Sequence, residues 1–112
     1  MYIVHSVLEK DIDLALEYYG HSSLEKSGYI HCSDIDTYEL VAPNFKDESE
    51  KRILLVIDKD KVKADIKWED GGGIDFPHIY GLLNTDSIVD VLEHKYNEHR
   101  EWIKPNGLDK YK

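Results

Sequence analysis

The pattern of apolar and polar positions predicts several short strands, one of them central. Residues 53–57 read Ile-Leu-Leu-Val-Ile, the longest apolar run of the chain, and a charged residue stands on each side of it. A short apolar run rich in β-branched residues is typical of a strand that is buried on both faces. We therefore expect it at the middle of a sheet, with shorter strands at residues 2–5, 29–33 and 66–69 and a flexible loop at the glycines of residues 71–73.

Helices are predicted between these strands. Ser6 and Glu9 have the spacing of a capping box, which predicts a helix that follows the first strand and ends near Gly20. The polar stretch of residues 21–27 then leads into the next strand as a connection. Residues 34–41 predict a second, short helix.

The last part of the chain is predicted to be helical. Residues 88–92 fit either a last strand or the beginning of this helix, and apolar residues at helical spacing predict the helix itself over residues 93–104. His94 and His99 lie five residues apart, which is not the spacing of two metal ligands on one helix face, so we interpret both as surface residues. Strands and helices mixed along 112 residues, without repeats, indicate one α+β domain over residues 1–112.

Net charge, apolar runs and cysteine content limit the expected partners and cellular location of the protein. The chain has 14 Lys and Arg against 23 Asp and Glu, a formal net charge of -9, which opposes attraction to nucleic acid and to anionic lipid surfaces. No apolar run approaches the ~20 residues of a membrane-spanning helix, and the amino terminus lacks the pattern of a signal peptide. Cys32 is the single cysteine, so no internal disulfide forms. We therefore expect a cytoplasmic protein that binds neither membranes nor nucleic acid.

Three histidines stand in apolar or aromatic segments at strand-like positions, namely His5, His31 and His78. Strands that are distant in the sequence commonly pair in one sheet, so these side chains can converge on one pocket for a small-molecule ligand. An imidazole titrates near neutral pH and acts as base, donor or acceptor, which makes His31 a candidate catalytic residue. A lone histidine in a strand also fits a structural role in which its ring bonds a backbone group.

The segment around His31 has a polar face and an apolar face. Side chains alternate along a strand, which places Tyr29, His31 and Ser33 on one side as a candidate pocket wall. Cys32 falls on the opposite side, so we expect a small core residue rather than a nucleophile activated by His31. Tyr29 and Tyr80 offer rings for stacking, although a half-buried ring with its hydroxyl in water is also typical of tyrosine.

Two blocks of the sequence carry a family resemblance. Residues 28–33 read Gly-Tyr-Ile-His-Cys-Ser, and residues 76–81 read Phe-Pro-His-Ile-Tyr-Gly after the Trp-Glu pair of residues 68–69. Together with the histidine of the first strand, these blocks resemble domain of unknown function 952, an uncharacterised bacterial family, from about residue 2 to residue 91. Residues 41–45 read Val-Ala-Pro-Asn-Phe where family members usually have Val-Ala-Asn-Arg-Phe, so no role of that arginine carries over to this chain.

The resemblance implies a compact relative of the ADP-ribosyltransferase fold, with a split, bent β-sheet, flanking helices and a cleft for NAD. It does not cover the predicted helix of residues 93–104. His5 matches a first-strand histidine that hydrogen-bonds the ribose on the nicotinamide side. The block around His31 also resembles the RNA 2′-phosphotransferase branch, but Arg52 and Arg100 are the only arginines, too few to grip a phosphate as a cluster. Our candidate cofactor-binding residues are His5, Tyr29, His31, Ser33, His78 and Tyr80.

Glu69 is the candidate catalytic carboxylate. Cleavage of the glycosidic bond of NAD builds positive charge on the ribose, and a carboxylate stabilises that charge. Glu69 follows Trp68 and precedes the glycine loop, so we expect stacking by Trp68 and a carboxyl pKa that is raised by partial desolvation. Glu69 equally fits the solvated end of a strand.

Three functions remain open at this point. The first is a small enzyme, or a degenerate one, that binds NAD or a related nucleotide as an ADP-ribosyltransferase-like transferase. The second is a non-catalytic module that binds a small ligand or a peptide without turnover. The third is a zinc site in which His5, His31 and His78 hold the metal with an open fourth position. We rank the metal site last and expect no metal.

Overall fold

Antiparallel strands make up most of the structure, and the helices between them are few and short. The computed structural model describes residues 1–112. Its strands are β1 (Tyr2–Leu8), β2 (Tyr18–Tyr19), β3 (Ile30–His31), β4 (Ser33–Asp34), β5 (Arg52–Asp58), β6 (Asp65–Asp70), β7 (Asp75–Tyr80), β8 (Leu83–Asn84), β9 (Ile88–Tyr96) and β10 (Trp102–Ile103). The α-helices are α1 (His21–Ser27) and α2 (Tyr38–Val41), and the 3-10 helices are η1 (Glu9–Asp11), η2 (Ala42–Phe45), η3 (Lys59–Lys61), η4 (Thr85–Ser87) and η5 (Asn106–Tyr111).

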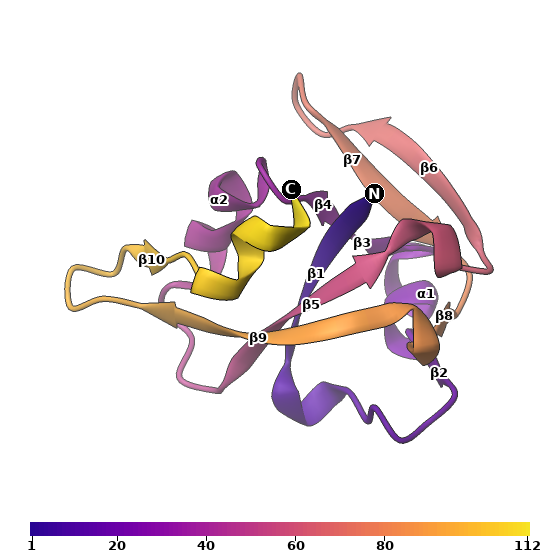
Figure 1. Cartoon of the computed structure of the whole chain (residues 1–112), viewed down its shortest axis with the longest axis horizontal. Coiled ribbons are helices and arrows are strands. Elements are labelled where there is room, and N and C mark those ends of the chain that lie inside the picture. The colour runs from indigo at the N-terminus through magenta and orange to yellow at the C-terminus, as the bar shows by residue number, and fades with distance from the viewer.

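The predicted central strand is confirmed as β5. The main sheet has the strand order β10-β9-β5-β1-β4, and two smaller sheets, β2-β8 and β3-β7-β6, lie beside it (Figure 1). The strand predicted at residues 66–69 is confirmed as part of β6, and the glycine loop of residues 71–73 joins β6 to β7. The result is a mixed architecture in which a curled antiparallel sheet is combined with short helices.

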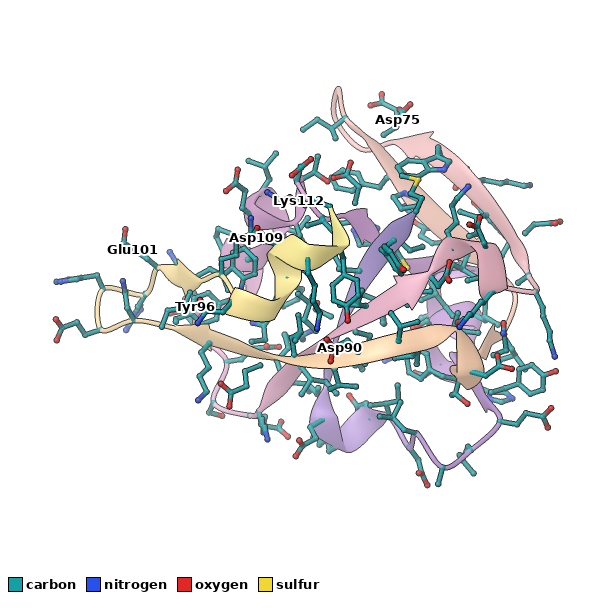
Figure 2. The ribbon with its side chains drawn as sticks, viewed as in Figure 1. Asp75, Asp90, Tyr96, Glu101, Asp109 and Lys112 are labelled. Atoms are coloured by element: carbon teal, nitrogen blue, oxygen red, sulfur yellow. The ribbon has the colours of Figure 1, made fainter.

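β5 separates two apolar cores, because its side chains alternate between the faces of the sheet. Leu55 packs in one core, with Ile3, Ile30 and Ile79, and Leu54 packs in the other. Both leucines are 0% exposed, which is the two-sided burial that the unbroken apolar run predicts. The second core is covered by α2 and by η5, the 3-10 helix whose Asp109 is labelled in Figure 2.

The chain passes from one sheet into another at Cys32. On one side of this residue β4 pairs with β1, and on the other side β3 pairs with β7. The backbone N–H of Cys32 donates to the carbonyl of Pro77 at 3.0 Å and thus already belongs to the second sheet. The last residue of β1 that pairs with β4 is Val4, so residues 5–8 form an open edge where the two sheets diverge.

The helix predicted after Ser6 is absent, which corrects the capping-box interpretation. β1 continues through Leu8 because its backbone pairs with β5 as far as Arg52. The N–H of Glu9 then donates to the carbonyl of Lys51 at 2.9 Å, one step beyond the strand. Pairing between distant strands overrides a local capping signal here.

Residues 21–27 form α1 instead of the expected connection. The helix lies between Gly20 and Gly28, whose φ angles of 117° and 82° are in the range that favours glycine. The N–H of Gly28 caps the carbonyl of Leu24 at 2.8 Å. Leu24 is the one apolar residue of the helix and packs against the first core, so the sequence shows no helical period there.

The helix predicted for residues 93–104 is wrong as well. β9 runs through Tyr96, and β10 returns beside it with Trp102 opposite Tyr96. Arg100 in the intervening turn has a φ of 61°, which an α-helix cannot contain. Side chains that point inward at every second position also recur at every fourth position. The sequence of this stretch therefore fits both the period of a strand and the period of a helix, and only the pairing with β10 and β5 distinguishes them. No helix of the structure has the length and apolarity that crossing a membrane requires.

Candidate functional site

A cleft of about 690 Å³ opens along the free edge of β1. Residues 5–8 form one wall, and the segment from Leu16 into α1 forms another, with Tyr29 and His31 also in the lining. Its volume lies within the range of roughly 300–1,000 Å³ that is typical of small-molecule sites. The cleft exists because β4 is short and β3 turns away from β1, so it is the candidate site that the fold itself creates.

His5 is buried at this edge, and both of its ring nitrogens are occupied. Nδ1 lies 2.6 Å from the carbonyl oxygen of His31, and Nε2 lies 2.8 Å from the hydroxyl of Tyr19. A carbonyl oxygen only accepts, so Nδ1 donates to it and Nε2 accepts the proton of Tyr19. Burial lowers the pKa of His5 to about 4, which keeps the ring neutral. His5 thus ties β1 to β3 just beyond the point where the backbone pairing of β1 with β4 stops.

A chain of hydrogen bonds, which we call the relay, joins His31, His78, Glu69 and Tyr80. Nδ1 of His31 lies 3.1 Å from Nε2 of His78, and Nδ1 of His78 lies 2.8 Å from Oε1 of Glu69. The Tyr80 hydroxyl donates to the same Glu69 oxygen at 2.5 Å. Strand register produces this arrangement, because His31 is opposite His78 across β3 and β7, and the β6–β7 hairpin places the other two on the same face as His78.

The relay fixes the positions of the protons on its two imidazoles. The ionised carboxylate of Glu69 only accepts, so Nδ1 of His78 carries a proton, and Nε2 of His78 accepts from Nδ1 of His31 when it carries no proton itself. Nε2 of His31 is then left with an unshared electron pair, on a side chain that is exposed and lines the cleft. Partial desolvation of the ring and the neighbouring His78 lower the pKa of His31, so its ring is neutral near pH 7. This nitrogen can therefore accept a proton from a molecule in the cleft.

Glu69 departs from the prediction in two respects. Hydrogen bonds from Tyr80 and His78 lower the pKa of its carboxyl, whereas the sequence led us to expect a rise by desolvation. Trp68 precedes it on β6 and therefore points to the opposite face, so it does not offer a stacking surface to a ligand ring beside Glu69. Glu69 does not line the cleft, and its carboxylate reaches the cleft only through His78.

Tyr29 packs against the relay. Its ring stacks on His78 with the centroids 4.1 Å apart and the planes 14° from parallel, and Tyr80 lies 5.5 Å away. The six predicted binding residues therefore divide into three places. Those in the cleft are His5, Tyr29 and His31, those beside it in the relay are His78 and Tyr80, and Ser33 lines a separate, smaller cavity.

The three-histidine zinc hypothesis gains no support from the geometry. No group of three His, Cys, Asp or Glu side chains is arranged to hold a metal ion. His5 and His78 each use both ring nitrogens in hydrogen bonds, and His31 alone keeps a free nitrogen. A metal would have to break these bonds before three imidazoles could meet.

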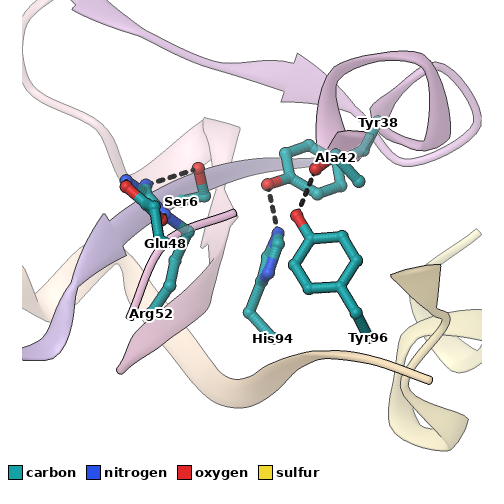
Figure 3. A network of polar contacts seen from close by, with 7 residues as sticks. All are labelled: Ser6, Tyr38, Ala42, Glu48, Arg52, His94 and Tyr96. Carbon is teal, nitrogen blue, oxygen red and sulfur yellow. Dashed lines mark hydrogen bonds and ion pairs between the residues drawn. The ribbon is translucent and has the colours of Figure 1, made fainter. Parts of the chain in front are cut away.

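Charged side chains of both signs line the cleft. Asp11 and Asp13 lie in the lining together with Lys26 and Arg52. Arg52 is already paired, since Nε and Nη2 donate to Glu48 at 2.7 and 2.8 Å, as Figure 3 illustrates beside Ser6. Lys26 makes no ion pair, so it is the cation that can meet an anionic group of a ligand.

Comparison with known proteins identifies the family. The family model described as a protein of unknown function, DUF952, matches residues 8–91, well over half of the chain. The chain belongs to the DUF952 family. His5 lies before the matched region, whereas the relay lies within it.

Solved structures show that this DUF952 chain shares its fold with protein CC0527 from Caulobacter crescentus. The crystal structure of CC0527 is similar with a TM-score of 0.82 and 21% identity, over 97% of this chain and 99% of that chain. Its solution NMR structure gives a TM-score of 0.72 and 21% identity, over 97% and 95% of the two chains. No curated protein matches.

A second polar network of this DUF952 protein was not predicted from its sequence. The Tyr38 hydroxyl lies 2.6 Å from Nε2 of His94, and the Tyr96 hydroxyl donates to the carbonyl of Ala42 (Figure 3). His94 is 7% exposed, so its interpretation as a surface residue is wrong, and burial lowers its pKa to about 4. The available signal was alternation, because Leu92, His94 and Tyr96 occupy every second position. The ion pair of Arg52 with Glu48 also had a signal in the sequence, because the two residues are four positions apart.

Cys32 of the DUF952 chain is expected to be unreactive. It is 1% exposed within the first core, which confirms its predicted place, and burial raises the pKa of the thiol. Since the thiolate is the reactive form, iodoacetamide should alkylate the native protein about 100-fold more slowly than the urea-unfolded chain. Mass spectrometry of timed samples measures both rates. Equal rates in the two states would contradict the core position.

Proposed function

We propose that the cleft binds NAD or a related dinucleotide and that the protein is an ADP-ribosyltransferase-like transferase in which His31 is the base. One observation carries the proposal. The free Nε2 of His31 lies on the cleft side of a relay that leads through His78 to the Glu69 carboxylate. When Nε2 accepts a proton, the proton on Nδ1 can move to His78, where the carboxylate stabilises the positive charge.

The charges of the cleft suit a dinucleotide of this kind. NAD combines a cationic nicotinamide ring with an anionic diphosphate. Asp11 and Asp13 complement the ring, and unpaired Lys26 complements the diphosphate. Tyr18, Tyr19 and Tyr29 add aromatic surface on which flat rings pack.

The divergence of the two sheets supports an ADP-ribosyltransferase-like arrangement. The sequence resemblance implies a split, bent sheet with the ligand in the opening, and here the sheet that contains β1 and the sheet that contains β3 diverge at Cys32. In this arrangement His5 is a positioning residue. Both of its nitrogens are bonded, and one of them holds the His31 carbonyl.

A non-catalytic binding module is the second candidate, and the state of Arg52 favours it. Glu48 already neutralises this guanidinium, and the arginine usual in family members near residue 44 is an asparagine here. Few cationic side chains then remain in the cleft to bind the two phosphates of NAD. A cleft of this kind also suits a less charged ligand that is bound without turnover.

Ligand-observed saturation-transfer NMR with NAD tests the binding. We expect signals from the nicotinamide and ribose protons with the wild type and at least tenfold weaker binding with His31→Ala, because that variant removes the ring facing the cleft. His99→Ala is the matched control, since the His99 side chain is 74% exposed in the turn after β9. No signal with the wild type, or equal binding by His31→Ala, would refute the nucleotide proposal.

Turnover separates the two candidates. The transferase proposal expects slow nicotinamide release by the wild type and release that is about 10- to 100-fold slower in Glu69→Gln, with NAD binding retained. Retained binding is expected because Glu69 lies outside the cleft. NAD binding without any nicotinamide release would establish the binding module instead.

A further inference from the structure

A second cavity of about 190 Å³ adjoins the cleft at His31. Four residues line both spaces: His5, Ser6, His31 and Arg52. The residues that line the smaller space alone are Val4, Ser33, Tyr38, Val41 and Phe45. We call this smaller space the inner cavity. The two spaces thus meet where the relay ends.

The size of the inner cavity limits its occupant to a single ring. An engineered cavity of about 150 Å³ in another protein holds one benzene molecule. The inner cavity is slightly larger, at about 190 Å³, which leaves room for one short substituent. A nucleotide or a peptide is far too large.

The charges around the inner cavity favour a neutral occupant. Arg52 is the one charged side chain in its lining, and Glu48 takes two of its N–H groups while Ser6 accepts a third at 3.1 Å. The guanidinium also lies 3.7 Å from the centroid of the Phe45 ring, so it is held against the wall. Figure 3 shows Arg52 with Ser6 and Glu48 on one side and Tyr38 with His94 on the other. An anion would compete with Glu48, and a cation would meet no carboxylate in the lining.

Two polar groups give the occupant an orientation. Ser33 is 1% exposed and lines the inner cavity, and its hydroxyl takes part in none of the side-chain hydrogen bonds of the structure. His31 offers Nε2, the free nitrogen of the relay. Ser33 and His31 lie two positions apart, so both side chains point to the same side of the segment. A hydroxyl group satisfies both, because it donates to an imidazole nitrogen and accepts from a serine.

We infer that the inner cavity is a binding site for a small, neutral aromatic alcohol, with the ring among Val4, Val41 and Phe45 and the hydroxyl between Ser33 and His31. Of the groups that hold this molecule, only His31 also lines the cleft proposed for NAD. The occupant would sit beside the dinucleotide rather than in its place.

This site deepens the proposed function and rests on it for its role, which is that of the acceptor. The alcohol oxygen would form a bond to C1′ of the nicotinamide ribose as the bond from C1′ to the nicotinamide nitrogen breaks. The electron pair of the broken bond stays on that nitrogen and neutralises the pyridinium, so nicotinamide leaves uncharged. The proton of the alcohol goes to Nε2 of His31. Atoms and charge balance with NAD as the one co-reactant.

Saturation-transfer NMR with benzyl alcohol tests the site in the full-length protein. We expect a signal with the wild type, about three- to tenfold weaker binding with Ser33→Ala, which removes one hydrogen bond, and no specific binding with Val41→Trp, which fills the cavity. Ser23→Ala is the matched control, because Ser23 lines the cleft but not the inner cavity. Dispersion of the amide spectrum verifies that each variant is folded.

The outcomes separate the two proposals. The inner site is overturned if the wild type does not bind benzyl alcohol. It is also overturned if Ser33→Ala and Val41→Trp bind benzyl alcohol as tightly as the wild type does. Should Val41→Trp not fold, Ser33→Ala against Ser23→Ala still decides. NAD binding without benzyl alcohol binding leaves the proposed function standing and removes the inner site. Benzyl alcohol binding without NAD binding supports the inner site and removes the dinucleotide proposal.

Discussion

Acidification from pH 7.5 to pH 4.5 is expected to lower the free energy of unfolding by several kcal/mol. Burial lowers the pKa of both His5 and His94 to about 4, from an ordinary value of about 6.5. Between these values the unfolded chain binds protons that the folded protein does not, so stability falls as the pH falls. Each of these two histidines contributes on the order of 3 kcal/mol to this loss by the time the pH reaches about 4. His31, whose pKa is also lowered, acts in the same direction.

Carboxyl groups change the free energy of unfolding in a separate and more acidic pH range. Hydrogen bonds from Arg52 lower the pKa of Glu48, and those from Tyr80 and His78 lower that of Glu69. Their stabilisation is complete above the unfolded value of about 4.3 and is lost as the pH falls through the folded value. A loss of stability between pH 6.5 and pH 4.5 therefore reports on the histidines.

Urea unfolding at pH 7.5, 6.0 and 5.0 measures this dependence. His94→Leu should flatten the slope by about half of the total, because it removes one of the two strongly shifted groups. His99→Gln should keep the full slope, since the His99 side chain is 74% exposed. A free energy of unfolding that stays constant across this range would show that the two buried rings titrate normally.

Leu55→Ala is expected to destabilise the protein by about 2–5 kcal/mol, the range for truncating a buried leucine. Leu55 is 0% exposed and lies on β5 between His5 of β1 and Val91 of β9. The substitution leaves a void in the first core, where strands on both sides limit collapse around it. Urea denaturation with a fitted m-value measures the change.

Leu16→Ala is the matched control for this prediction. Its side chain is 58% exposed, so the same truncation should change the free energy of unfolding by about 0.5 kcal/mol or less. A loss below about 1 kcal/mol for Leu55→Ala would mean that the centre of the sheet is less tightly packed than the structure indicates.

Local sequence patterns predicted the parts of the fold that depend on local chemistry. β5 was predictable because five consecutive apolar residues leave no polar face, and Cys32 because alternation is a property of any strand. The helix predicted after Ser6 failed because the partner of β1 lies more than forty positions away, in β5. The helix predicted over residues 93–104 failed because a strand and a helix fit the same spacing there.

The candidate site was predictable in its residues but not in its connections. His31 and His78 stand opposite each other only in one register of β3 and β7, and a shift by one residue would turn one ring to the other face. The register of β6 and β7 in turn brings Glu69 to His78 and turns Trp68 away. Tyr19 was missed as the partner of His5 because it lies in a region predicted to be helical, where no contact with β1 was expected.

Residues 30–34 contribute one short strand to each of two sheets, and this segment couples the shape of the cleft to the packing of the core. Ile30 and Cys32 are packed in the first core, and His31 between them faces the cleft. A shift of this segment that improves the packing of the core would therefore displace His31, the proposed base, by a similar amount. A shift that widens the cleft would loosen the core. Engineering this protein for heat resistance and engineering it for a new ligand would thus compete for the same short stretch of backbone.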